Sequence, residues 1–267
     1  MKSKKILKVF CIILLILLIL VGTIYVVFSI FGNRNKYIMQ ASVQEGLDAI
    51  KKQYQVTELD AGEFEDMRFY GIMKFHVDQY KVEELGNLSV MTADMGFMQM
   101  VSFLVTPFEK NVPMCAMDFM YIFNTRKSYV EFYDLGADTG SEEYKAVQDK
   151  LREMVARYDK VEEIPAEKAW YDEYLNVVMH KKLSIDEETE NSEMFNDAIT
   201  TYINATKTMP RLSEEEMARQ HGNTQLYCEG LISKGGVSTD VFKKALGEEK
   251  THDFFNKVFF GTGLYFY

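Results

Sequence analysis

The 267-residue sequence has few of the residues that stiffen or cross-link a chain. It contains three cysteines, four prolines and one tryptophan, which excludes a disulfide-stapled scaffold and a collagen-like or proline-rich protein. Internal repeats and low-complexity linkers are also absent, and 47% of the residues are hydrophobic. These features exclude a disordered chain and leave ample material for at least one large core.

Basic residues are scarce after the first 36 positions. Six of the 30 precede Glu45, the first acidic residue, so residues 37–267 carry 24 basic and 40 acidic side chains and a net charge of −16. A nucleic-acid backbone would be repelled by such a surface. DNA and RNA are therefore excluded as the main partner.

One long apolar run is present near the N-terminus. Residues 9–33 carry no charge, and the stretch from Phe10 to Phe31 is almost wholly Leu, Ile, Val and Phe. This length spans the hydrocarbon layer of a bilayer, whereas a signal peptide has a shorter apolar region and a small-residue cleavage site. The run predicts a single-pass transmembrane helix over 9–33, in contact with membrane lipid, after a basic segment over 1–8.

The charges that flank this run predict its orientation. Four lysines precede it, and only Arg34 and Lys36 lie directly after it. By the positive-inside rule, the N-terminus is cytoplasmic and the C-terminal part of the chain is extracytoplasmic.

The cysteines lie at positions 11, 115 and 228. Cys11 falls inside the predicted membrane segment, which leaves Cys115 and Cys228 either as two buried thiols or as one disulfide. Neither the cysteines nor the four histidines have the spacing of metal ligands. The sequence therefore predicts no metal site and no intrinsic cofactor.

The remainder divides into a predicted juxtamembrane helix and linker over 34–64 and one domain over 65–267. Met73, Phe75 and Val77 alternate with polar residues, as in a half-covered strand. Further strands are expected over 88–93, 97–105, 115–123, 128–133 and 174–179, and helices over 142–158, 184–203, 213–232, 238–247 and 248–260. Ser184 with Glu187, and Ser213 with Glu216, have the form of capping boxes. The pattern predicts an α/β fold, a three-layer α/β/α sandwich with a central antiparallel sheet.

Several short motifs follow a known order. Leu246-Gly247-Glu248, Phe254 and Val258-Phe259-Phe260 match the pattern F-G-x-x-W-x-x-x-Y-x-x-x-V-L-F-D without a gap, and Gln225-Leu226-Tyr227-Cys228 is similar to the helix that precedes it. Residues 170–174 and 113–118 add two weaker matches. Together they make residues 65–261 resemble the ferredoxin-dependent bilin reductase family and, more distantly, red chlorophyll catabolite reductase.

The resemblance implies a bilin between the sheet and the C-terminal helices, protonated by side chains while electrons arrive from ferredoxin. Asp118 occupies the position of the family's catalytic aspartate, in an otherwise apolar strand. The family's strand histidine falls near Val101 or Ser102, its His-x-Glu pair near Ser89 and Met91, and its Asn-Asp turn at Gly235-Gly236. Most of the proton donors are thus replaced.

The resemblance and the local pattern give a candidate site. Asp118 is the candidate catalytic acid, because a buried carboxyl can hold its proton near neutrality. His221 lies one helical turn from Met217 and Gln225 and is a candidate ligand contact, whereas His76, His180 and His252 are interpreted as surface residues. The candidate ligand-binding residues are Met91, Val101, Ser102, His221, Tyr227, Gly235 and Gly236.

Three functions follow from these observations. The first is a membrane-anchored protein that binds a linear tetrapyrrole or a similar planar apolar ligand without the family's standard proton donors. The second is an active bilin oxidoreductase that uses Asp118. A ferredoxin-type electron donor fits it poorly, because ferredoxin is acidic and cytoplasmic. The third is an envelope protein that binds partners and no ligand.

Overall fold

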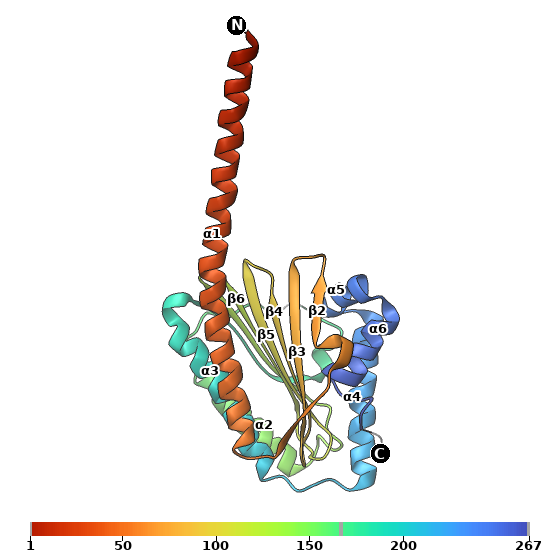
Figure 1. Cartoon of the computed structure of the whole chain (residues 1–267). Coiled ribbons are helices and arrows are strands. Elements are labelled where there is room, and N and C mark those ends of the chain that lie inside the picture. The colour runs from red at the N-terminus through yellow and green to blue at the C-terminus, as the bar shows by residue number, and fades with distance from the viewer. Residues whose placement is uncertain (1, 166–167, 266–267) are drawn as a thin grey trace.

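The computed structural model describes residues 2–165 and 168–265, and its centre is an eight-stranded antiparallel sheet (Figure 1). The strand order is β1-β3-β4-β5-β6-β7-β8, and β1 and β2 pair one after the other with the same edge of β3. The strands are β1 (Val56–Leu59), β2 (Asp66–Phe69), β3 (Met73–Val82), β4 (Gly86–Asp94), β5 (Met98–Pro107), β6 (Met114–Ile122), β7 (Thr125–Tyr133) and β8 (Leu175–Ser184).

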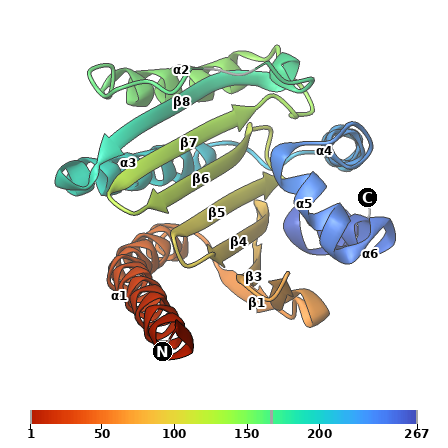
Figure 2. The ribbon, with the colours of Figure 1, turned by 90° about the horizontal axis from the view of Figure 1, so that it is seen from above.

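Helices cover both faces of the sheet, as the view from above shows (Figure 2). One face packs against α1 (Lys2–Lys51), α2 (Glu142–Ala156) and α3 (Glu188–Lys207). The other packs against α4 (Glu214–Lys234), α5 (Val237–Leu246), α6 (Glu248–Asp253) and the π-helix η4 (Phe254–Phe259). The predicted fold class, a three-layer sandwich around an antiparallel sheet, is confirmed.

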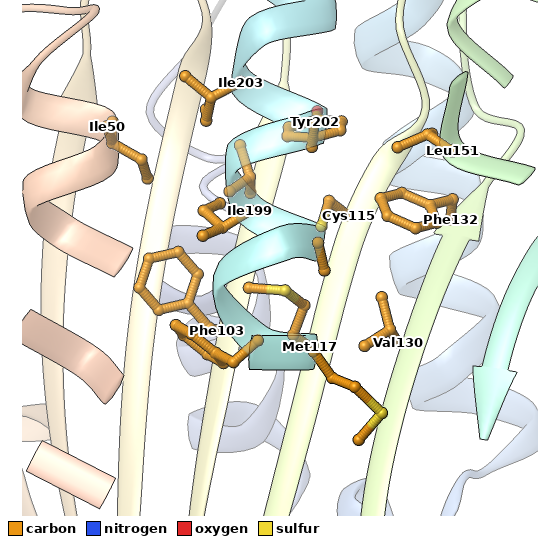
Figure 3. Close-up of a cluster of buried hydrophobic side chains, with 14 of the residues drawn as sticks. Ile50, Phe103, Cys115, Met117, Val130, Phe132, Leu151, Ile199, Tyr202 and Ile203 are labelled. Atoms are coloured by element: carbon orange, nitrogen blue, oxygen red, sulfur yellow. The ribbon is translucent and has the colours of Figure 1, made fainter. Parts of the chain in front are cut away.

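The period-2 geometry of the strands produces two separate cores. On β5 and β6, Phe103, Cys115 and Met117 point toward α3 and join a cluster that includes Ile199 and Tyr202 (Figure 3). The residues between them along the strands point to the opposite face, toward α4 and η4. Several strands are apolar on both faces because each face has its own helical cover.

This division settles the cysteine pairing that the sequence leaves open. Cys115 is buried in the core beside α3, and Cys228 is buried in the core between the sheet and α4. The sheet separates the two side chains, and both are free thiols.

Helix α1 is continuous, which differs from the expected boundary between a membrane helix and a separate linker. Its second half belongs to the domain: Leu47 and Ile50 are buried in the core, and a Cβ built on Gly46 would lie 2.9 Å from the ring of Phe195. Strand β1 also joins the sheet. Residues 34–64, predicted as a juxtamembrane helix and linker, therefore pack into the domain, because their apolar stripe covers β5 and α3.

Polar contacts fix the same junction. The guanidinium of Arg126, fully buried on β7, donates a hydrogen bond to Asn35 Oδ1 (3.1 Å) on α1 and forms an ion pair with Glu188 (2.5 Å) on α3. A buried guanidinium requires such partners. The three elements are thereby held to one another at the end of the domain from which α1 emerges.

The start of α1 has a different character. Among the described residues, Ile12–Lys51 is the one helix that is long and apolar enough to cross a membrane. Residues 12–30 are all exposed, and apart from Gly22, Thr23 and Ser29 their side chains are large and mostly aliphatic or aromatic.

Both predicted capping boxes are present. Ser184 pairs with Glu187 at η3 (Ile185–Glu187), and Ser213 pairs with Glu216 at the start of α4. Each box satisfies backbone N–H groups that the first turn of a helix would otherwise leave without partners.

Candidate functional site

A cavity of about 520 Å³ lies between the sheet and the layer formed by α4, α5 and η4. This volume is in the range of pockets that hold small molecules. Its floor consists of side chains from β4 to β8. The apolar part of the floor includes Met91, Met100, Leu104, Met114, Ala116 and Val178.

A polar row crosses the middle of this floor. The strand register pairs Met91 with Ser102, Ser102 with Asp118, Asp118 with Tyr129, and Tyr129 with His180. Residues paired in register project from the same face of a sheet, about 5 Å apart. Five neighbouring strands thus contribute one side chain each, and the four residues after Met91 are polar.

Glu131 lies one step along β7 from this row and connects to it. His180 Nε2 lies 2.8 Å from Glu131 Oε1, and the Tyr133 hydroxyl donates a hydrogen bond to Glu131 Oε2 (2.5 Å). The side chains of His180 and Glu131 are 17% and 16% exposed. Charge-assisted hydrogen bonds of this kind hold both groups in fixed positions at the cavity floor.

Asp118 lies in an environment that favours its protonated form. Burial is the main reason that its pKa is raised to about 6; a hydrogen bond with Ser102 opposes this effect, and the negative charge of Glu131 adds to it. The side chain is nevertheless partly accessible, because it faces the cavity. A carboxyl group in this state holds its proton at slightly acidic pH and can exchange it with a basic atom in the cavity.

The opposite wall of the cavity is aromatic and apolar. Tyr227 and Leu231 come from α4, Thr239 from α5, and Phe255 and Phe259 from η4. The π-helical turn of η4 widens the backbone where these phenylalanines project, a distortion often found at functional sites. The wall offers flat apolar surface with few polar atoms.

The one tryptophan supports this wall. Trp170 Nε1 donates a hydrogen bond to the carbonyl oxygen of Gly235 (2.9 Å), and its ring lies 5.9 Å from that of Tyr227. The ring also lies against Gly230 on α4, where a Cβ would come within 2.4 Å of it. Only glycine at position 230 permits this close packing.

The predicted site residues fall into two groups. The cavity brings together Asp118, Met91, Ser102, Tyr227 and Gly236. Val101 instead points into the core beside α3, because it is next to Ser102 in an alternating strand. Gly235 ends α4 with φ +87° and contributes its carbonyl to Trp170 rather than to the cavity. His221 lies outside the lining, where its Nε2 is 2.7 Å from the Thr262 carbonyl oxygen.

The histidines also differ from the prediction in one case. His180, interpreted from sequence as a surface residue, lines the cavity and contacts Glu131. The sequence prediction missed both of these residues. The alternation of Tyr129, Glu131 and Tyr133 along β7 contains the signal that could have placed Glu131 on the cavity face. His76 and His252 are partly exposed and paired with acidic residues, as expected.

A group with the spacing of metal ligands lies away from the cavity. Among the described residues, one group brings three ligand atoms within 4.8 Å of one another, from Glu65, Asp66 and His76. Both carboxylate residues are exposed, and the ring of His76 is already hydrogen-bonded to Asp66 (2.9 Å). This group has the character of a surface ion-pair cluster.

No family model matches the sequence, and no curated protein matches it. A solved structure does match: phytochromobilin synthase from tomato in complex with biliverdin, with a TM-score of 0.70 and 12% sequence identity. The match covers 84% of this chain and 83% of the tomato chain. The two proteins share a fold. At this identity the similarity supports the expected relationship to bilin reductases at the level of the fold alone.

Proposed function

We propose that this chain binds a linear tetrapyrrole, or a planar apolar ligand of similar size, in the cavity between the sheet and η4. The observation that carries the proposal is the combination of an apolar cavity of about 520 Å³ with the row of polar groups centred on Asp118. A linear tetrapyrrole has the matching chemistry: extended apolar faces and a central set of pyrrole nitrogens that exchange protons. The shared fold with a protein solved in complex with biliverdin supports the same ligand class.

Asp118 is the residue we assign to the ligand nitrogens. It stands near the middle of the floor, and its raised pKa allows it to hold or share a proton near neutral pH. Met91, Ser102 and Tyr227 would contact the ligand beside it, and Gly236 would line the helical end. Glu131 and His180 form a second charged group within the same cavity.

The same feature supports a second candidate function. A bilin oxidoreductase requires a proton donor close to the pigment, and Asp118 with the Glu131–His180 pair meets this requirement. The electrons would have to come from an external one-electron donor. Ligand binding is the function that the cavity supports best, and turnover would add to it.

We further propose that α1 anchors the protein to a membrane, with the N-terminus in the cytoplasm and the domain outside. The exposed apolar side chains of residues 12–30 and the four preceding lysines support this arrangement. The domain would then receive its ligand at or near the bilayer surface.

A titration tests the binding proposal. The full chain, in detergent micelles, is titrated with biliverdin while visible absorption and tryptophan emission are recorded. Because Trp170 packs against Tyr227 at the cavity wall, a bound pigment should quench its emission together with a saturable change in the visible spectrum. Absence of both signals would refute tetrapyrrole binding and favour a protein that binds partners only.

Matched variants make the site specific. Ala116→Phe places a ring on the cavity floor, whereas Ala156→Phe places the same ring at the exposed end of α2. We expect the first variant to lose biliverdin binding and the second to retain it. Equal affinity in both would place the ligand elsewhere. In Asp118→Asn, binding should persist while the pH dependence of the bound spectrum near pH 6 disappears.

A further inference from the structure

Three hairpin tips lie side by side at one end of the strands, the end from which α1 emerges (Figure 1). The register aligns them: Lys74 on β3 pairs with Asp94 on β4, and Met98 on β5 pairs with Ile122 on β6. The tips are residues 70–72, 95–97 and 123–124. We call Tyr70, Ile72 and Phe97 the rim.

The rim is apolar and exposed. Ile72 is 70% exposed, Tyr70 64% and Phe97 43%. Tyr70 also has a positive φ of 51°, in the left-handed region that residues other than glycine rarely adopt. Backbone strain of this kind is often found at functional sites. A water-facing hairpin would ordinarily carry polar residues at these positions.

The rim is continuous with the apolar part of α1. Phe28 and Phe31 pack against Phe123 at ring distances of 5.5 and 5.8 Å, and the ring of Phe97 lies 6.4 Å from the same phenylalanine. A Cβ on Gly32 would be 3.2 Å from the carbonyl oxygen of Gly96. The exposed apolar helix therefore meets the hairpin tips directly, with no spacer between them.

Basic side chains lie behind the rim, and an anionic lipid surface attracts such side chains. Arg68 and Lys74 are exposed and form a cross-strand pair next to the β2–β3 tip. Arg34 donates to Asn124 Oδ1 at the β6–β7 tip, and Lys36 neutralises Asp94 (2.7 Å). Arg68 and Lys74 stand out because residues 37–267 carry a net charge of −16. Aromatic rings with adjacent basic side chains are typical of membrane interfaces.

From this geometry we propose that the rim inserts into the headgroup layer of the membrane that α1 crosses. The domain then sits on the lipid surface on the side of β2 to β5. The acidic start of α3 follows the end of β8, at the same end of the strands. Its negative charge favours contact between the lipid surface and the β2 side of the domain. The inference rests on the proposed anchoring by α1 and is independent of what the cavity binds.

Tryptophan quenching by brominated lipids tests this inference. The full chain carrying Trp170→Phe is reconstituted in phosphatidylcholine vesicles containing phosphatidylglycerol, with bromine on the acyl chains close to the headgroups. Ile72→Trp and Phe97→Trp place the sole tryptophan in the rim. The matched control is Leu226→Trp, an exposed aliphatic position on α4 that is 72% exposed. If Trp170→Phe lowers the yield of folded protein, the same variants are compared with the native chain by difference.

We expect emission from both rim positions to shift to shorter wavelength and to be lost in brominated vesicles, with no loss at position 226. Alkaline extraction of the same vesicles reports whether α1 is inserted. An inserted chain with unquenched rim tryptophans would overturn the rim contact and leave the anchoring in place. A chain released by alkali would overturn both. Equal quenching at all three positions would overturn the upright orientation. Biliverdin titration of the same vesicles tests ligand binding in the cavity separately.

Discussion

The raised pKa of Asp118 makes a quantitative prediction about stability. In the unfolded chain this carboxyl ionises near its ordinary pKa of 3.8, whereas in the folded protein its pKa is about 6. Each pKa unit corresponds to about 1.4 kcal/mol, so ionising Asp118 costs the folded state at most about 3 kcal/mol. Asp118 is partly accessible from the cavity, so solvent screening lowers the expected cost to about 1–3 kcal/mol.

The sign of the pH dependence follows. Above the folded pKa the carboxylate is charged in both states, and the full cost opposes folding. As the pH falls through about 6 the folded protein takes up the proton first, and below 3.8 the cost is gone. Asp118→Asn removes the charge at every pH. The variant should therefore gain stability over the native chain at pH 8, and the gain should shrink toward pH 4.

Guanidinium unfolding of the full chain in detergent, followed by Trp170 emission at several pH values, measures this difference. Any pH-independent change in packing or hydrogen bonding shifts the whole curve, so the slope with pH is the diagnostic quantity. Asp159→Asn is the control, because Asp159 is exposed in the turn after α2. A difference between Asp118→Asn and the native chain that stays flat from pH 4 to pH 8 would refute the assignment of a raised pKa.

Three further predictions concern the site and its support. Glu131→Gln removes a negative charge that helps to raise the pKa of Asp118, so carboxyl NMR should show Asp118 titrating at lower pH; an unchanged midpoint would contradict the coupling. Gly46→Ala forces a methyl group into an aromatic ring of α3 and should destabilise the domain by about 1–3 kcal/mol, whereas Gly22→Ala, in open surroundings, should leave denaturant unfolding unchanged. Gly230→Ala should displace Trp170 and shift its emission to longer wavelength, with weaker biliverdin binding; a native emission spectrum would show that the close contact is not needed.

Much of the fold was accessible from the sequence because its signals are local. Alternation over 73–77, capping boxes at Ser184 and Ser213, and the uncharged run over 9–33 each reflect one element, and the structure contains the corresponding strand and helices. The short strands β1 and β2 were missed. Each has four residues and is stabilised by pairing with β3, which no local pattern reports.

The site was less predictable, because it depends on which strands are neighbours. A motif points to Asp118, but Glu131 and His180 contact each other across β7 and β8, 49 positions apart. His180 adjoins two lysines in sequence, which favours the interpretation that it is exposed to solvent. Lys181, however, points to the opposite face of the sheet and is itself only 2% exposed. Val101 was predicted together with Ser102, although period-2 geometry places adjacent strand residues on opposite faces.

In the membrane-anchored arrangement proposed above, the unbroken course of α1 fixes the direction in which the domain faces within the membrane plane. An α-helix turns by about 100° per residue. The rotation of the apolar half of α1 about its axis therefore determines the direction in which the domain faces. Asn176 and Val178, the exposed lining residues on β8, mark the side on which the cavity opens. The cavity therefore opens in a fixed direction relative to any protein that binds α1. One residue added beside Gly22, where α1 is clear of the domain, would rotate that direction by about a quarter turn, whereas seven would nearly restore it.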